Sequence, residues 1–307
     1  MRALVLGGNG FIGSHLVDLL LQRGHRVRVF DRSPNRYQAP YPEVDYRLGQ
    51  FGDSAEIAEA LQDIDVVFHL ISTSVPSTSN LDPVADINGN LVGTVQLLQQ
   101  MVKLGLKRIV YLSSGGTVYG NPTLEPVPET HPLHPICSYG VVKVAIENYL
   151  FMFQQLHGLL PTVLRASNPF GPRQGHIGVQ GVIPTFLARL VQGDRLQIWG
   201  DGSVVRDYIY IADLVDLAML AGESSATGVF NAGSGSGCSL NEIVRVIERI
   251  SGRTVPVDYL PGRAFDVREI TLDVRSAKAA FGWQPRTSID EGIRRHWDWL
   301  QTISAHQ

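Results

Sequence analysis

Residues 1–13 read MRALVLGGNGFIG, and in them a short apolar run passes directly into glycines. Gly7, Gly10 and Gly13 lie at the junction of this run with residues 11–22, whose apolar side chains recur at helical spacing. A tight turn needs a positive φ, a bound pyrophosphate needs bare backbone N–H groups, and close packing of a helix on a strand needs a missing side chain. Glycine-rich turns are also common after buried strands, so this pattern alone leaves open whether the turn binds anything.

Short apolar runs alternate with helical patterns through the first half of the chain. This strand–helix–strand rhythm predicts a parallel sheet covered by helices on both faces. We therefore expect an α/β protein with a Rossmann-type, doubly wound parallel sheet. The expected strands are residues 3–6, 27–30, 66–70, 109–112 and 162–164, and the clearest helices are 11–22 and 91–104.

Asp31 ends the second expected strand, eighteen residues after Gly13. A carboxylate at this place accepts hydrogen bonds from the ribose hydroxyls of adenosine and repels a 2′-phosphate, which favours NAD over NADP. Arg32 follows directly and weakens that discrimination. Strand, glycines, helix, strand and acid together predict a dinucleotide site.

The rhythm changes after Ser167, where glycine and proline become more frequent and irregular loops separate the helical patterns. We expect a smaller α/β lobe here, which binds the substrate. Segment 205–220, VRDYIYIADLVDLAML, is expected to return a strand and a helix to the first sheet. The predicted division is an NAD-binding domain of residues 1–166 plus about 204–232, and a substrate-binding lobe of residues 167–203 and 233–307.

The composition of the 307 residues excludes several classes of protein. A net charge of -3 supplies no general attraction for nucleic acid or for an anionic membrane. Two cysteines, Cys137 and Cys238, make no disulfide framework and suit a reducing compartment, so we expect a cytoplasmic protein. No apolar segment is long enough for a membrane span. His131 and His134 have no acidic or cysteine partners at ligand spacing, so no metal site is expected.

Residues 138–149, SYGVVKVAIENY, form an expected helix with Tyr139 and Lys143 on one face, four residues apart. Both lie at the margin of the apolar stripe, so we expect them to be half buried and to face a cleft. An ammonium near a phenol, in a site that also holds a cationic nicotinamide, lowers the pKa of the phenol, which can then take a proton from an alcohol while hydride leaves the same carbon.

These motifs resemble the extended short-chain dehydrogenase/reductases. Within that group the resemblance is to the nucleotide-sugar epimerase and dehydratase family, closest to the 4-epimerases of UDP-glucose or UDP-N-acetylglucosamine. It runs nearly end to end. Beside the glycine turn and YxxxK, it rests on SSGGTVYG (113–120), NPFGPRQ (168–174), VVRDYIYIADL (204–214) and DVRSAKAAFGWQP (273–285).

The resemblance implies roles for the central residues. Tyr139 would be the base, and Lys143 would bind the nicotinamide ribose and tune the tyrosine. A third group, a hydroxyl that binds the sugar oxygen, usually stands at the place of Gly115. Because glycine has no hydroxyl, Thr117 or Ser114 would have to supply this hydrogen bond.

The resemblance also implies the contacts of cofactor and substrate. Besides Tyr139 and Lys143, the NAD contacts would be Gly7, Gly10, Phe11, Ile12, Gly13, Asp31, Arg32, Asn35, Gln50, Phe51, Leu70, Ser72 and Asn90. Besides Thr117, the contacts of the nucleotide-diphosphate sugar would be Asn168, Val182, Gln197, Trp199, Arg206, Arg263 and Asp266.

Residues 115–117 also separate the reactions of the family. Related 4,6-dehydratases carry Thr-Asp-Glu there, and related decarboxylases carry a glutamate at the last position, whereas this chain has Gly-Gly-Thr. This favours NAD-dependent 4-epimerisation of a UDP-hexose or UDP-N-acetylhexosamine through a transient 4-keto sugar. A nucleotide-sugar reductase or dehydrogenase with exchangeable cofactor, or a non-catalytic NAD-binding regulator, stays an alternative, and 4,6-dehydration is disfavoured.

The identity of the sugar, and whether its carrier is a nucleotide or a lipid diphosphate, stay open at this point. The resemblance further implies a homodimer that pairs two helices from each subunit. The expected helices are residues 91–104 and 139–157.

Overall fold

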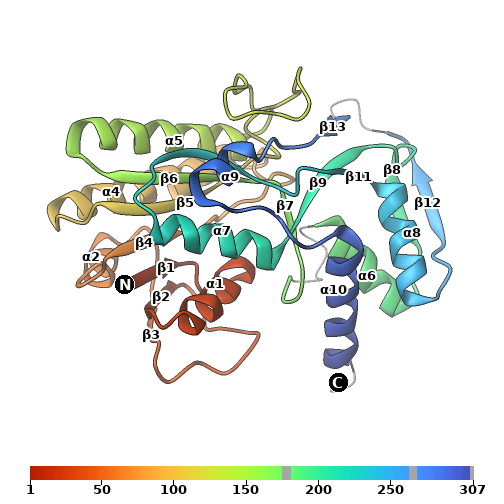
Figure 1. Cartoon of the computed structure of the whole chain (residues 1–307), viewed down its shortest axis with the longest axis horizontal. Helices are drawn as coiled ribbons and strands as arrows, with labels where there is room; N and C mark the ends of the chain where they lie inside the picture. Colours follow the sequence, from red (N-terminus) through yellow and green to blue (C-terminus); the bar gives the residue numbers. More distant parts are fainter. Residues whose placement is uncertain (175–180, 263–267, 305–307) are drawn as a thin grey trace.

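The computed structural model describes residues 1–174, 181–262 and 268–304. Its larger part is built on a seven-stranded sheet in which every neighbouring pair of strands is parallel (Figure 1). This confirms the predicted fold class. The strands, in spatial order, are β10 (Gly228–Ala232), β6 (Leu160–Ala166), β5 (Arg108–Ser114), β4 (Val66–His69), β1 (Arg2–Leu6), β2 (Arg26–Asp31) and β3 (Asp45–Leu48).

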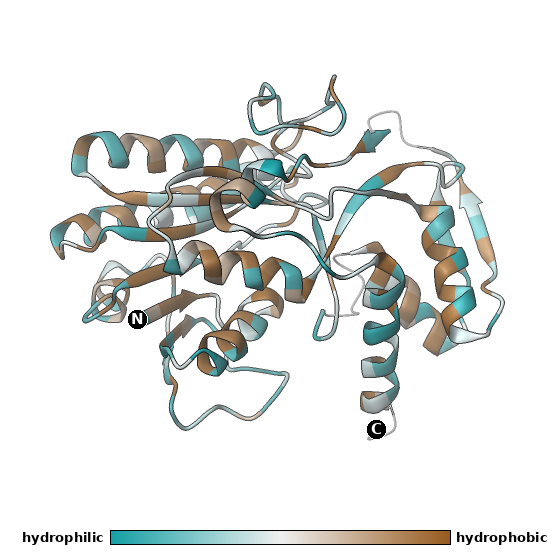
Figure 2. Ribbon diagram, in the orientation of Figure 1, coloured by the Kyte–Doolittle hydropathy of each residue, from teal (hydrophilic) through white to brown (hydrophobic). Residues whose placement is uncertain are grey.

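Helices cover both faces of this sheet because its central strands are apolar on both sides. In β1, Leu4 and Leu6 join the hydrophobic cluster on one face, while Ala3 and Val5 join the cluster on the other. Figure 2 shows β1 and the neighbouring β2 in the brown of hydrophobic residues. One face carries α2 (Ser54–Ala60), α4 (Gly93–Lys103) and α5 (Ser138–His157), and the other carries α1 (Phe11–Gln22) and α7 (Ile211–Glu223).

The helix expected at residues 91–104 is part of a longer helical segment. The segment begins with α3 (Pro83–Asp86), where Asp82 caps the N–H of Ala85, and continues as the π-helical turn η1 (Ile87–Val92) into α4. Single π-helical turns inside helices are rare and are frequent at functional sites.

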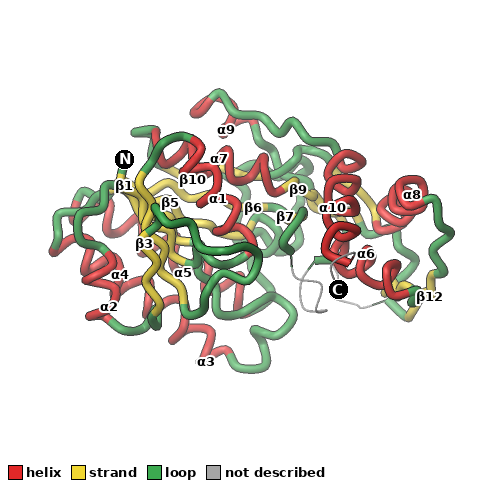
Figure 3. Tube along the Cα trace, turned by 90° about the horizontal axis from the view of Figure 1, so that it is seen from below, coloured by secondary structure: helices red, strands yellow, loops and turns green. Residues whose placement is uncertain are grey.

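The molecule also has a smaller lobe. Figure 3 shows α6, α8 and α10 together at one end of the molecule, away from the large sheet. The capping box of Ser239 and Glu242 begins α8. The elements of the lobe are β7 (Asn168–Phe170), α6 (Val182–Gln192), β8 (Leu196–Trp199), β9 (Val205–Tyr210), β11 (Gly237–Ser239), α8 (Leu240–Ser251), β12 (Val257–Leu260), β13 (Glu269–Ile270) and α10 (Ile289–Ser304). Helix α9 (Arg275–Phe281) instead packs on β10 and α7 of the large domain.

The expectation for segment 205–220 was right for its helix and wrong for its strand. Helix α7 packs against α1 and β5 of the large domain. Strand β9 instead pairs with β7, β11 and β13 in a separate four-stranded sheet. The edge of the large sheet beside β6 is taken by β10, so β9 is left to build the smaller lobe. The predicted domain boundaries stay a prediction.

Candidate active site

The turn after β1 has the geometry that its glycines predict. Gly7 has a φ of +82°, a conformation that L side chains rarely adopt. A Cβ on Gly13 would lie 2.2 Å from the carbonyl oxygen of Gly7, so the first turn of α1 packs directly on the strand exit. Helix α1 starts at Gly10 with no side-chain cap and no acidic residue in its first turn. Its open N–H groups suit a pyrophosphate.

A cavity of about 330 Å³ opens beside this turn, at the carboxyl ends of the strands. It brings together eight of the residues predicted to bind the cofactor. It also contains residues that the sequence reasoning missed, among them Asn9, Ser33, Arg36 and Thr73. The eight predicted residues are Gly7, Gly10, Asp31, Arg32, Gln50, Phe51, Leu70 and Ser72.

Asp31 is held in the cavity wall by backbone hydrogen bonds. Its carboxylate oxygens accept from the N–H groups of Asn9, at 3.0 Å, and Ser33, at 3.3 Å. A carboxylate that is fixed at the end of β2 suits the ribose hydroxyls of adenosine. Arg36 lines the same wall but lies in an irregular loop without periodic pattern, so no sequence signal pointed to it.

Five other residues that were predicted to bind the cofactor are not among the residues that line the cavity. The carboxamide oxygen of Asn35 accepts the N–H of Tyr37, at 2.8 Å. The carboxamide oxygen of Asn90 accepts the N–H of Thr73, also at 2.8 Å, and so supports the cavity wall from behind. The other three, Phe11, Ile12 and Gly13, form the first turn of α1.

Tyr139 lies in the first turn of α5, half buried, and the side chains of Ser72 and Ser114 interact with its phenol. Because Ser72 also lines the cofactor cavity, the tyrosine lies next to a residue of that cavity. Burial raises the pKa of Tyr139 to about 12, although Ser72 and Ser114 lower it. In the chain without NAD, loss of water around the phenol outweighs its favourable contacts, and the low pKa expected beside a cationic nicotinamide stays a prediction.

Lys143 is buried, with 6% of its surface exposed, one helical turn after Tyr139. Its ammonium donates to the carbonyl oxygen of Leu112 at 2.9 Å and lies 5.4 Å from the ring centroid of Tyr139. Burial lowers the pKa of Lys143 to about 8, while the negative charges of Glu147 and Asp86 raise it. Tyr139 thus has the half-buried position expected for a helix margin, whereas Lys143 lies deeper than expected.

The third predicted group depends on residues 114–117. A Cβ on Gly115 would lie 2.5 Å from a methyl carbon of Leu272 and 2.9 Å from the carbonyl oxygen of Arg165, so Leu272 occupies the place of a side chain there. The side chain of Ser114 interacts with the phenol of Tyr139. The hydroxyl of Thr117 is buried and has no hydrogen-bond partner within the described residues.

A second cavity, of about 360 Å³, opens in the smaller lobe between β7, β8, β9 and α6. Arg206 is half buried there, and the amide of Asn168 donates to the carbonyl oxygen of Asp207 at 2.8 Å. The predicted substrate residues that line this cavity are Asn168, Val182, Gln197, Trp199 and Arg206. Two others, Arg263 and Asp266, lie outside the described residues.

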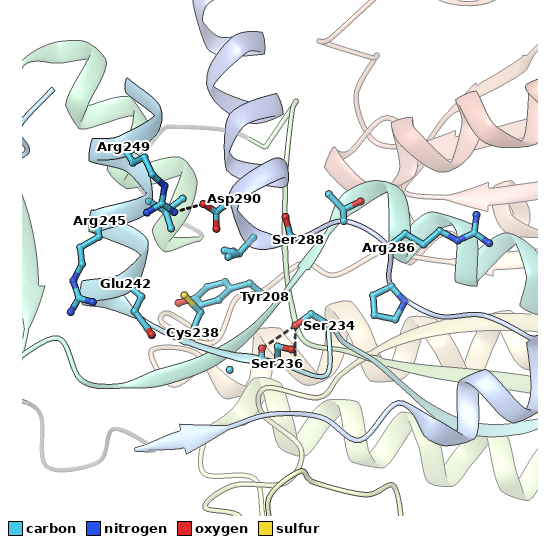
Figure 4. Close-up of a pocket in the computed structure, with 15 residues that line it drawn as sticks. Tyr208, Ser234, Ser236, Cys238, Glu242, Arg245, Arg249, Arg286, Ser288 and Asp290 are labelled. Carbon is cyan, nitrogen blue, oxygen red and sulfur yellow. Dashed lines mark hydrogen bonds and ion pairs between the residues drawn. The ribbon is translucent and has the colours of Figure 1, made fainter. Parts of the chain in front are cut away.

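A larger hollow, of about 650 Å³, lies between α8 and the start of α10. Its charges are mixed, since Arg249 pairs with Asp290 (Figure 4). In the same view Arg286 points away from Tyr208 in the centre. The hollow contains none of the predicted site residues. In the part of the chain that the structure describes, no three His, Cys, Asp or Glu residues are grouped as a metal site requires, and no helix has the length and hydropathy to cross a membrane.

The dinucleotide turn, the acid that ends β2 and the tyrosine–lysine pair of α5 define a short-chain dehydrogenase/reductase. The chain belongs to the NAD dependent epimerase/dehydratase family, whose sequence model matches residues 3–233. It is 36% identical over 304 residues to the UDP-glucose 4-epimerase of Mycolicibacterium smegmatis, which covers 96% of this chain and 97% of the relative.

Two solved structures have the same fold over almost their whole length. The UDP-glucose 4-epimerase of Thermotoga maritima, with UDP-glucose, has a TM-score of 0.95 and 36% identity over 99% of this chain and 100% of that one. The UDP-glucose 4-epimerase of Thermus thermophilus, in complex with NAD, has a TM-score of 0.91 and 33% identity over 98% of this chain and 99% of that one.

Proposed function

We propose that the protein is an NAD-dependent nucleotide-sugar 4-epimerase that acts on a UDP-linked hexose through a transient 4-keto sugar. The observation that carries the proposal is the closeness of Tyr139 to Ser72, because Ser72 interacts with the phenol and also lines the cofactor cavity. The substrates and cofactors named for the similar epimerases above agree with it.

The residues of the cofactor cavity fit NAD. The uncapped start of α1 suits the pyrophosphate, and the fixed carboxylate of Asp31 suits the adenosine ribose. When bound, NAD supplies the acceptor and donor of hydride at the sugar C4.

Tyr139 is the proton acceptor and donor for the C4 hydroxyl in this proposal. Its neutral phenol must lose a proton before it can act as a base, and the pKa of about 12 in the chain alone opposes that loss. A cation bound near the phenol favours the phenolate, as the ammonium of Lys143 does from the other side. Protein groups and bound cofactor thus act together to produce the base.

Ser114 is the better candidate for the hydroxyl that orients the sugar oxygen. Its side chain interacts with the phenol of Tyr139, whereas Leu272 fills the space beside Gly115. Thr117 stays the second candidate, because a buried hydroxyl without a partner is costly unless a ligand satisfies it. Paired variants separate them: Ser114→Ala and Thr117→Val each remove one hydroxyl, and the larger loss of kcat identifies the group in use.

The cavity of the smaller lobe is proposed to hold the diphosphate and base of the substrate. A guanidinium such as that of Arg206 presents paired donors to phosphate oxygens. Trp199 offers an exposed aromatic face in the same cavity. Binding through these groups leaves the sugar itself loosely held, which a 4-keto sugar needs in order to present its other face.

Incubation of the purified protein with single nucleotide sugars tests the function. UDP-glucose, UDP-N-acetylglucosamine, their galacto epimers and UDP-glucuronate are offered separately, and NMR of the anomeric protons identifies the products. We expect one pair of C4 epimers to interconvert from either side with no net change in NADH absorbance. An oxidised sugar that accumulates with an equal amount of NADH would establish the dehydrogenase alternative.

We also propose that the enzyme is a homodimer that pairs α4 and α5 of each subunit. Large exposed apolar side chains gather on α5, and four of them fall within one face at 100° per residue. Light scattering should give twice the mass of the chain, and Leu156→Asp should reduce it to one chain. The exposed apolar residues on α5 are Val141, Tyr149, Phe151, Met152 and Leu156.

A cytoplasmic location is part of the same proposal. Both cysteines, Cys137 and Cys238, are free thiols in the structure, which suits a reducing compartment. Fractionation of cells that express the protein, with immunodetection, checks the location.

A further inference from the structure

Asp86 is a buried carboxylate beside the tyrosine–lysine pair that the proposed reaction does not use. It ends α3, and only 2% of its surface is exposed. One carboxylate oxygen accepts the hydroxyl of Ser138 at 2.7 Å. The other accepts the hydroxyl of Ser74 at 2.6 Å and the amide of Asn90 at 2.8 Å. A buried carboxylate with three donors is a fixed part of the site.

These hydrogen bonds join three segments that meet at Tyr139. Ser138 is the first residue of α5 and directly precedes Tyr139. Its backbone N–H is also held, by the side-chain oxygen of Asn80 at 2.8 Å. On the other side, the hydroxyl of Ser72 donates to the carbonyl oxygen of Ser74 at 3.0 Å. Asp86 therefore positions both the helix that carries the phenol and the loop that carries Ser72, whose side chain interacts with the phenol.

Asn90, in the π-helical turn η1, lies four residues after Asp86 and contacts it. The amide of Asn90 reaches both the carboxylate of Asp86 and its carbonyl oxygen, the latter at 3.2 Å. Its own oxygen accepts the N–H of Thr73 in the cofactor cavity wall. The same turn therefore links Asp86 to both the tyrosine and the cofactor cavity.

The charge of Asp86 is the second part of the inference. Two carboxylates act on the buried ammonium of Lys143, those of Glu147 and Asp86. Glu147 forms a buried ion pair with Arg165 at 2.6 Å, which offsets its charge. No ion pair to Asp86 occurs among residues 1–174, 181–262 and 268–304, so no cation of an ion pair offsets its charge as Arg165 offsets that of Glu147.

We propose that Asp86 is a positioning residue for the tyrosine–lysine pair: it fixes the first turn of α5 and the loop of Ser72, and it adds a buried negative charge to the surroundings of Lys143. The inference rests on the proposed role of this pair in the reaction. The inference can fail the test below while the proposed function stands. The groups that face Lys143 are Asp86 from α3, Glu147 and Tyr139 from α5, Tyr111 from β5 and His69 from β4.

Titration of Lys143 by NMR tests the charge directly and without turnover. The chain has four lysines, and the other three, Lys103, Lys107 and Lys278, are exposed. With ¹³C-labelled lysine, the Lys143 signal is assigned from its loss in Lys143→Arg and followed against pH, before and after saturation with NAD.

The substitution Asp86→Asn keeps the shape of the side chain and removes its charge. We expect the titration midpoint of Lys143 to fall by about one pH unit. The matched control is Asp82→Asn, an exposed aspartate four residues earlier that caps the N–H of Ala85, and it should leave the midpoint unchanged. A midpoint that stays the same in Asp86→Asn overturns the proposal, whatever the activity of the variant.

The positioning part has its own variant, Ser138→Ala, which removes one hydrogen bond to Asp86 and keeps the charge. We expect kcat to fall about tenfold, with KM and the Lys143 midpoint unchanged, because only the placement of Tyr139 is relaxed. A wild-type kcat in Ser138→Ala contradicts this part. If the Lys143 midpoint is unchanged in Asp86→Asn and kcat is unchanged in Ser138→Ala, while Tyr139→Phe loses its activity, the proposed function stands and only the role of Asp86 is removed.

Discussion

The cofactor cavity and the substrate cavity differ in how the chain builds them. The first is lined by the ends of consecutive strands of one parallel sheet, and its acid and glycines are fixed by backbone hydrogen bonds and by direct backbone packing. The second is assembled from β7, β8, β9 and α6, which come together through pairings distant in sequence. One cavity is a local property of the chain, and the other depends on its long-range topology. We therefore expect substitutions in the first to affect NAD and the chemical step, and substitutions in the second to affect substrate binding.

The largest effect is expected beside the cofactor cavity, from Tyr139→Phe. Removal of the hydroxyl removes the proton acceptor, so kcat should fall by about 10³-fold, within the range for general acid–base groups. The amount of NAD bound to the purified variant should equal that of the wild type, because the phenol lies next to the cofactor cavity rather than in its lining. Substantial turnover by this variant would contradict the assignment of Tyr139 as the proton acceptor.

A substrate-side substitution should separate binding from chemistry. Arg206→Ala removes the half-buried guanidinium of the second cavity, and the lost charge-assisted hydrogen bonds should raise KM by about 10- to 100-fold. Bound NAD should be unchanged. Steady-state kinetics and the NAD content of the purified variant check both statements. Arg206→Lys keeps the charge but loses the paired donors of the guanidinium, so its KM should lie between those of the wild type and Arg206→Ala.

A cofactor-side substitution should act in the opposite way. Asp31→Ala removes the acceptor at the end of β2 and leaves Arg32 and Arg36 in the same wall. We expect NAD to bind about tenfold more weakly and NADP to gain relative to NAD, because the carboxylate no longer repels a 2′-phosphate. Calorimetric titration with both dinucleotides measures the change. A KM for the nucleotide sugar that rises while NAD affinity stays the same would contradict this assignment of the cavities.

The comparison also separates what the sequence could predict from what it could not. Helix α1 has the predicted bounds, and the turn glycines have the geometry assigned to them, since each depends on neighbours within a few residues. Strand β9 was placed in the wrong sheet, because strand pairing is decided by the competing strand β10. The pKa of about 12 that burial gives Tyr139 had no sequence signal, because distant segments bury the phenol. The low pKa expected beside a bound nicotinamide stays a prediction.

The role of Asp86 had no sequence signal for a similar reason. Its partners lie at Ser74, Asn90 and Ser138, in three separate segments. Nothing in the pattern around residue 86 reveals that these segments meet. Arg263 and Asp266, predicted only from the resemblance, lie outside the described residues and stay predictions.

The pH profile of kcat should report the protonation of the Lys143 side chain. Burial lowers its pKa to about 8, so the ammonium is present below that pH and is lost as the pH rises through it. Because the ammonium favours the phenolate of Tyr139, kcat should decline above about pH 8. Lys143→Arg, which keeps a charge at all these pH values, should flatten the decline even if its maximum is lower.

The smallest effect is expected on stability, from Gly115→Ser. The new Cβ would meet Leu272 at 2.5 Å, so we expect a loss of about 1–3 kcal/mol in the free energy of unfolding. Leu272→Ala in the same chain should recover part of that loss, and chemical denaturation of the four variants gives the coupling. An unchanged free energy of unfolding in Gly115→Ser would show that the packing of Leu272 against residue 115 can adjust to a side chain.

The most direct test of the account is the fate of the hydrogen on the sugar C4. UDP-glucose that carries deuterium at C4 is incubated with the enzyme in ordinary water, and the C4 epimer is analysed by NMR and mass spectrometry. The account predicts an epimer that keeps its deuterium, with no net NADH formed. Deuterium replaced by solvent hydrogen, or a 4-keto sugar that has lost its C6 oxygen, would contradict it.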